Sequence, residues 1–143
     1  MPESSFLEGK VIKRSLPVLQ LPLRPDAPAL RRLLLPQGEL AQFYNAAEGI
    51  HYMAFIELLP GRVRGNHYHK TKEEFVYVVR GEVVLSLADI DSKARASVTL
   101  GAGDLVVIRT GIAHALRILE PGYAIEFSSS QFDPADIHKF LLE

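Results

Sequence analysis

Three histidines and one glutamate, residue types that bind metal ions, are set at short intervals in two segments of the chain. His67, His69 and Glu74 lie within residues 61–81, and His114 follows in a second segment. Imidazole nitrogens and a carboxylate oxygen suit a divalent ion of iron, manganese, nickel, zinc or copper, and the chain has no cysteine for a thiolate site. Three neutral ligands and one anion leave such an ion with positive charge, so the site could polarise a substrate oxygen or lower the pKa of a bound water.

The first segment predicts a strand, a turn and a second strand. His67 and His69 are two residues apart, so their side chains leave a strand on the same face. Glu74 lies an odd number of residues beyond His69, but the polar residues 70–72 predict a turn after which the alternation restarts. Glu74 can then face the histidines across the strand pair. Glu73 is the rival carboxylate, and the inward parity of the second strand favours Glu74.

The second segment, residues 101–114, predicts a turn, a short apolar strand and another turn, with His114 at the start of a returning strand. A single histidine on a strand is more often a hydrogen-bonded core or surface residue than a ligand. Four ligand types at these spacings favour a metal site over that alternative. His51 and His138 lack a comparable pattern, so we predict structural or exposed roles for them.

Both segments match a known sequence pattern. The first fits G-x5-H-x-H-x4-E-x6-G, and the second fits G-x5-P-x-G-x2-H-x3-N except that Arg109 replaces the proline and Ile118 the asparagine. With these matches, residues 51–128 resemble the cupin superfamily. The resemblance implies an all-β fold, a double-stranded β-helix or jelly-roll cupin barrel, with one divalent transition metal inside. The four ligands that it implies are His67, His69, Glu74 and His114.

A narrower resemblance concerns two short stretches. Residues 64–72 and 132–136 are similar to cupins that isomerise or epimerise the sugar of nucleotide sugars. In some ketoisomerases of that kind, paired histidines act as acid and base without a metal, which would make His67 and His69 the catalytic residues. Such a mechanism requires neither Glu74 nor His114, so the sequence favours a metal.

Length and composition predict a single cupin domain over residues 1–143. Its expected parts are an irregular, proline-rich arm at 1–30, the barrel at 31–128 and a short C-terminal helix at 133–142. Asp133 is the expected N-cap of that helix. Ile137, Phe140 and Leu141 form the apolar stripe that would pack against the barrel.

Charge and hydropathy limit the partners. The net charge of −1 predicts no binding to nucleic acid or to an anionic membrane. No apolar run approaches the roughly 20 residues of a membrane span, and no secretory signal is evident, so a cytoplasmic location is expected. Small barrels expose strand edges unless these are covered. Since the proline-rich arm could cover such an edge on a second copy, we predict a homodimer.

Basic residues near the proposed ligands favour an anionic small-molecule substrate. Arg64 and Arg109 are the candidate substrate-binding residues, because arginine pairs with carboxylates and phosphates through parallel hydrogen bonds. Strand alternation places Arg64 opposite the histidines unless Gly65 interrupts the strand. Three hypotheses follow: a metalloenzyme for isomerisation, epimerisation or dioxygenation of a small anionic or sugar-derived substrate; a metal-free nucleotide-sugar isomerase; and a non-catalytic barrel that holds a metal or a small ligand.

Overall fold

The computed structural model describes residues 3–142, and within them the chain is all-β apart from one 3-10 turn. In chain order the elements are β1 (Glu3–Phe6), β2 (Val11–Ser15), β3 (Val18–Leu19), β4 (Arg31–Leu35), β5 (Gly38–Gln42), β6 (Tyr52–Leu58), β7 (Val63–Tyr68), β8 (Glu74–Asp89), β9 (Arg95–Gly101), β10 (Asp104–Ile108), β11 (Ile112–Ser128), the turn η1 (Pro134–Asp136) and β12 (His138–Lys139). The all-β jelly-roll class predicted from the sequence is confirmed.

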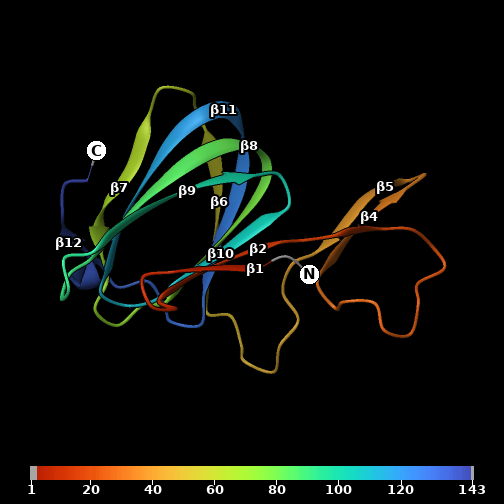
Figure 1. Cartoon of the computed structure of the whole chain (residues 1–143), viewed down its shortest axis with the longest axis horizontal. Helices are drawn as coiled ribbons and strands as arrows, with labels where there is room; N and C mark the ends of the chain where they lie inside the picture. The colour runs from red at the N-terminus through yellow and green to blue at the C-terminus, as the bar shows by residue number, and fades with distance from the viewer. Residues whose placement is uncertain (1–2, 143) are drawn as a thin grey trace.

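Two long strands organise the barrel (Figure 1). β8 and β11, of 16 and 17 residues, pair with each other in antiparallel fashion, and β10, β9, β7 and β6 add to them on either side. Their register shifts around residues 118–124, at the bend of β11. Gly122 lies in that bend, and a Cβ there would overlap the carbonyl oxygen of Arg80, so the strands can approach only at a glycine.

Most of the barrel interior is apolar. On β8 the inward positions include Val76 and Val78, while Phe75 and Tyr77 face outward, as the alternation of the sequence predicts. Burying each such side chain contributes about 1.5–3 kcal/mol to folding. The buried interior residues are Val11, Ile56, Leu58, Val76, Val78, Val83, Leu85, Leu87, Val98, Leu100, Val106, Ile108, Ile112, Ile118 and Ala124.

The N-terminal arm is more regular than the sequence predicts. β1 and β2 form a hairpin, and β2 extends the barrel sheet by pairing with β10. The prediction of an irregular arm was wrong here because no proline lies between Pro2 and Pro17, which leaves residues 3–15 free to donate backbone hydrogen bonds. Val11 is fully buried in the core, so the arm contributes to the barrel itself.

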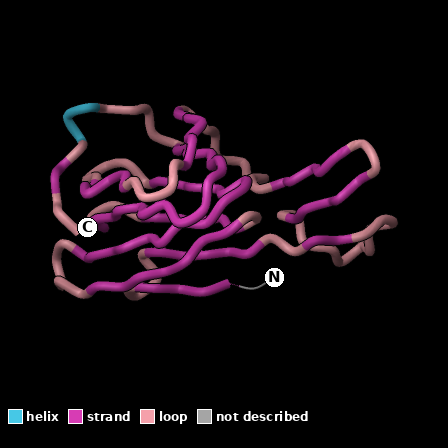
Figure 2. The backbone as a smooth tube through the Cα atoms, turned by 90° about the horizontal axis from the view of Figure 1, so that it is seen from above, coloured by secondary structure: helices cyan, strands magenta, loops and turns pink. Residues whose placement is uncertain are grey.

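Residues 31–42, which the sequence places in the barrel, instead form β4 and β5, which make a separate three-stranded sheet with β3. Figures 1 and 2 show the β4–β5 hairpin projecting away from the barrel. The chain that follows covers the outer face of β8. There Phe43 stacks on Tyr77, with ring centroids 4.2 Å apart and an interplanar angle of 5°.

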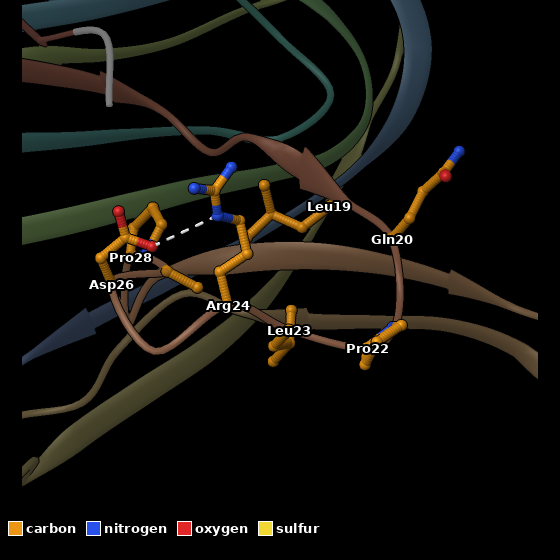
Figure 3. A pocket seen from close by; sticks show the side chains of 8 residues that line it. Leu19, Gln20, Pro22, Leu23, Arg24, Asp26 and Pro28 are labelled. Carbon is orange, nitrogen blue, oxygen red and sulfur yellow. Dashed lines mark ion pairs between the residues drawn. The ribbon is translucent and has the colours of Figure 1, made fainter.

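A loop between β3 and β4 encloses a surface cavity of about 390 Å³ (Figure 3). It is lined entirely by residues of the loop and of β3, between Leu19 and Pro28. Arg24 and Asp26 form an ion pair at 3.7 Å across it, but both side chains are more than four-fifths exposed. Such a pair contributes little to stability. None of the candidate site residues contributes to this cavity.

The predicted C-terminal helix was wrong beyond its first turn. Asp133 does cap η1, since its carboxylate accepts a hydrogen bond of 2.9 Å from the backbone N–H of Ala135. The chain then extends at Ile137, and β12 pairs with β7. Because β7 presents an otherwise open edge to this segment, the backbone bonds of the sheet replace those of a helix. Leu141, from the predicted apolar stripe, is 78% exposed.

Among the described residues, no helix is long and apolar enough to cross a membrane.

Candidate metal centre

Three histidine side chains meet inside the barrel. His67 lies near the end of β7, His69 directly follows that strand, and His114 is the cross-strand partner of His67 on β11. The ring nitrogens that could bind a metal lie within 4.8 Å of one another. The structure therefore brings together the three histidines that the sequence selected.

A bulge in β7 aims His67 at this cluster. Gly65 and Asn66 both have positive φ, 98° and 58°, and the pairing with β11 shifts between His114 and Ala115. Gly65 runs so close to β11 that a Cβ there would lie 2.6 Å from the carbonyl oxygen of His114. Glycine is therefore required both by the backbone conformation and by the space beside β11.

We expect Gly65→Ala to weaken both folding and metal binding, because the added methyl group would push β7 away from His114. The strained backbone and the clash together should cost about 2 kcal/mol or more of unfolding free energy, measured by urea denaturation. A zinc titration should show weaker binding. Gly61→Ala is the matched control, since Gly61 also has positive φ, 77°, but a Cβ at that position would have no atom within 4 Å. Equal effects of the two changes would contradict this account.

Glu74 supplies the carboxylate that faces the histidines. It opens β8 after the turn at residues 70–72, as predicted, and its side chain is almost completely buried. Oε1 lies 3.6 Å from Nε2 of His69, and Oε2 lies 3.2 Å from Nε2 of His114. The rival carboxylate, Glu73, instead forms an ion pair with Arg109 at 3.0 Å.

The hydrogen bonds of the outer ring nitrogens leave the inner ones free. Nδ1 of His69 lies 2.8 Å from the carbonyl oxygen of Asp136, and Nδ1 of His114 lies 3.1 Å from that of Ile112. A carbonyl can only accept, so each neutral ring carries its proton on Nδ1 and a lone pair on Nε2. Both Nε2 atoms are buried and form no hydrogen bond within residues 3–142.

This arrangement fits a metal ion. In the neutral tautomers, two nitrogen lone pairs face the Glu74 carboxylate at 3.2–3.6 Å, and acceptors do not stabilise one another at that distance. A cation placed among them would satisfy all of these groups at once, and burial without one is costly. His67 contributes the third imidazole. The donor set therefore suits a divalent transition metal.

The electrostatics of the cluster depend on Glu74. Burial, together with the neighbouring His114 and His69, lowers the pKa of His67 to about 4, so this ring is neutral at pH 7. Burial opposes ionisation of Glu74, but His114 and His69 outweigh it and hold the pKa of Glu74 well below its usual range. Burial also opposes charging of His114, and Glu74 outweighs that effect to raise the pKa of His114.

Asp136 fixes the turn between the two ligand-bearing strands. Its buried carboxylate accepts hydrogen bonds from the backbone N–H groups of Lys70, Thr71 and Lys72 at 2.8–3.1 Å, and from the Thr71 hydroxyl at 2.7 Å. Burial opposes the charge of this carboxylate, but these hydrogen bonds lower the pKa of Asp136 to about 2. No local pattern marks Asp136 as a functional residue, although it lies within the stretch 132–136 that carries the narrower resemblance.

Lys72 and Glu126 lie next to the cluster and were also missed as functional residues. Lys72 is buried, and its Nζ lies 3.0 Å from Glu126, 3.4 Å from Glu74 and 4.4 Å from the ring centroid of Tyr52. Burial opposes its charge, but Glu74 and Glu126 outweigh that effect and raise the pKa of Lys72. Burial and the nearby Glu74 carboxylate raise the pKa of Glu126. The one sequence signal for Glu126 is its position two residues after Ala124 on the same strand. Alternation along the strand points both side chains inward.

The two candidate arginines are placed differently. Because of the bulge, Arg64 pairs with Leu116, whose side chain packs against the barrel interior. Cross-strand partners share a face, so the interruption at Gly65 puts position 64 on the face of the histidines. The Arg64 side chain itself is exposed, and its Nη2 donates a 3.4 Å hydrogen bond to the carbonyl oxygen of Glu57. Arg109 pairs with Glu73 and lines a cavity of about 320 Å³ on the outside of the barrel, between β10 and the segment after β5.

Comparison with known proteins identifies the family of this chain. Residues 54–129, more than half of the chain, match the Cupin domain family. The chain belongs to the cupin family. Oxalate decarboxylase OxdC from Bacillus subtilis is 30% identical over 80 residues, which are 54% of this chain and 20% of that protein. The chain thus spans about a fifth of the length of this relative.

Solved structures share the fold of this cupin at low sequence identity. The TDP-quinovose 3,4-ketoisomerase WlaRB from Campylobacter jejuni superposes with a TM-score of 0.67 and 20% identity, covering 78% of this chain and 88% of that one. The rmlC epimerase from Mycobacterium tuberculosis gives a TM-score of 0.75 and 14% identity, with coverage of 97% and 72%. Both likenesses support the jelly-roll cupin barrel expected from the sequence.

Proposed function

We propose that this cupin binds one divalent transition metal through His67, His69, Glu74 and His114 and acts as a metalloenzyme on a small anionic or sugar-derived substrate. The observation that carries the proposal is the pair of buried, unbonded Nε2 atoms facing the Glu74 carboxylate. Their outer nitrogens are fixed by backbone carbonyls, so the rings are oriented before any ion binds.

The substrate class follows from charge and from the similar proteins. Oxalate and TDP-sugars, named for those proteins, are both anionic. When bound, a divalent ion supplies a Lewis acid for a substrate oxygen, which suits isomerisation or epimerisation and, with iron or manganese, dioxygenation. Arg64 would hold the anionic part of the substrate, since it shares the face of the histidines. Arg109 is the weaker candidate because Glu73 already binds it.

A metal-free nucleotide-sugar isomerase is the second candidate, favoured by the similarity of the fold to the TDP-sugar ketoisomerase. In that case His67 and His69 would transfer the proton. Burial and the neighbouring His114 and His69 lower the pKa of His67 to about 4, so the ring is neutral at pH 7 but a weak base, which makes this the second candidate and not the first.

Elemental analysis of protein purified without chelator or added metal tests these alternatives. We expect about one equivalent of a divalent transition metal per chain. TDP-sugars and small dicarboxylates are then assayed before and after chelation, with metal added back. Turnover lost on chelation and restored by the metal supports the metalloenzyme. Turnover unaffected by chelation supports the metal-free isomerase, and bound metal without any turnover supports a non-catalytic barrel.

We further propose that the protein is a homodimer. Met53 and Phe55 on the outer face of β6 are 62% and 68% exposed, and Leu34 on the projecting hairpin is 60% exposed. A second copy would cover these side chains. Sedimentation velocity at micromolar concentration should show a dimer, and Phe55→Glu should shift it toward monomer. A wild-type protein that sediments only as a monomer would contradict the proposal.

A further inference from the structure

Glu74 lies between the histidine cluster and a second cation that belongs to the protein itself. Its Oε2 faces His114, whereas Oε1 lies 3.6 Å from Nε2 of His69 and 3.4 Å from Nζ of Lys72. The same carboxylate oxygen is therefore within reach of both the ammonium group and the proposed metal position. Any ion bound by the histidines shares this carboxylate with Lys72.

Lys72 cannot turn away into water. Only 5% of its side chain is exposed, and its ammonium group lies 4.4 Å from the ring centroid of Tyr52 and 5.8 Å from that of Phe132. Its backbone N–H is held by Asp136 at 3.1 Å. A buried ammonium stays charged only when anions surround it, and here the anions are Glu74 and Glu126.

The charge of Lys72 has opposite effects in the metal-free and the metal-bound protein. Without an ion, the ammonium helps to neutralise the buried Glu74 carboxylate, whose other neighbours are the Nε2 atoms of His69 and His114. With a divalent ion present, the Lys72 ammonium and the ion are two positive charges on either side of the same Glu74 carboxylate. They repel each other, and this repulsion is strong where water is excluded. Glu126, 3.0 Å from Nζ, offsets part of it.

We propose that Lys72 is a positioning residue that acts as the internal counter-ion of Glu74 and competes with the metal for it. The charge of Lys72 then stabilises the metal-free site and limits metal affinity, and Glu126 moderates the competition. This inference rests on the proposed metal function. Metal affinity is then adjusted by Lys72 and Glu126, neither of which is a proposed ligand.

Two substitutions with opposite expected signs test the competition. Lys72→Met removes the ammonium, so we expect zinc to bind about tenfold more tightly in a chelator-competition titration at pH 8. The Tm of the metal-free protein should fall, and the rise of Tm on adding zinc should grow. Glu126→Gln leaves the ammonium directed at Glu74 alone, and we expect zinc to bind several-fold more weakly. Damage to packing alone would weaken binding in both variants.

Two further variants serve as controls. Lys72→Arg keeps the charge and should bind zinc like the wild type, and Lys70→Met changes an exposed lysine of the same turn and should alter neither affinity nor Tm. Equal or weaker zinc binding by Lys72→Met overturns the inference. Should that variant fail to fold, Glu126→Gln decides alone, since unchanged or tighter binding there also overturns it. A wild-type protein that binds neither zinc nor cobalt(II) would instead refute the proposed metal function.

Discussion

Replacing His114 with alanine is expected to abolish stoichiometric metal binding and to leave the barrel folded. The change removes one of only three imidazoles, among the described residues, whose nitrogens lie within 4.8 Å of one another. Loss of a residue that merely supports a ligand already costs 10–100-fold in metal affinity, so loss of a ligand should cost at least about 100-fold. Elemental analysis and a zinc titration measure the effect, and circular dichroism checks the fold.

The companion variants separate binding from stability. His67→Ala should lose the metal to the same extent, but it should destabilise the metal-free protein less, because His67 is partly exposed whereas His114 is buried. His51→Ala is the control. His51 is exposed, bonds the carbonyl of Ser129 and lies outside the cluster, so its removal should leave metal content unchanged. Stoichiometric metal in both the His67 and the His114 variants would rule out the proposed site.

The histidine cluster could be predicted because it depends on local rules. Alternation along a strand puts His67 and His69 on one face, and the turn at residues 70–72 resets the parity for Glu74. The sequence also identified the condition for Arg64, namely that Gly65 must interrupt the strand. The structure meets it with a bulge, where Gly65 has φ of 98°.

The errors arose where a long-range contact overrode a local preference. Asp133 and Pro134 are ordinary signals for the start of a helix, and one turn does form. The edge of β7 then competes for the same backbone groups, and a two-residue strand at His138–Lys139 results. The N-terminal strands have a similar origin, since β2 is ordered by β10, which lies about 90 residues further along the chain and is invisible to local reasoning.

The network around Lys72 could not be predicted for the same reason. Lys72 and Glu126 are 54 residues apart, and each resembles an ordinary surface residue in its own segment. Only the closure of β11 against β8 brings them together beside Glu74. From the sequence alone, Lys72 and Glu126 look like two independent, solvent-exposed charges. Once they are buried, each charge needs the other as its partner.

Asp136→Asn is expected to weaken metal binding although Asp136 is not a proposed ligand. The carboxylate accepts four hydrogen bonds from residues 70–72, and the backbone carbonyl of Asp136 orients His69. An amide offers one oxygen and turns its NH2 group toward N–H donors, so the turn should loosen and His69 should lose its fixed orientation. We expect metal affinity to fall about 10–100-fold and the unfolding free energy to fall by about 2 kcal/mol at pH 7. Zinc titration and urea denaturation measure these.

The acid dependence of stability distinguishes this role from general damage. Hydrogen bonds lower the pKa of Asp136 from 3.8 to about 2 on folding, so its contribution is complete above about pH 4 and is lost as the pH falls toward 2. The difference in unfolding free energy between the wild type and Asp136→Asn should therefore shrink over that interval. Asp133→Asn is the matched control, because asparagine caps a helical turn as well as aspartate does. A difference that stays constant between pH 4 and pH 2 would show that the charge of Asp136 does not hold the turn.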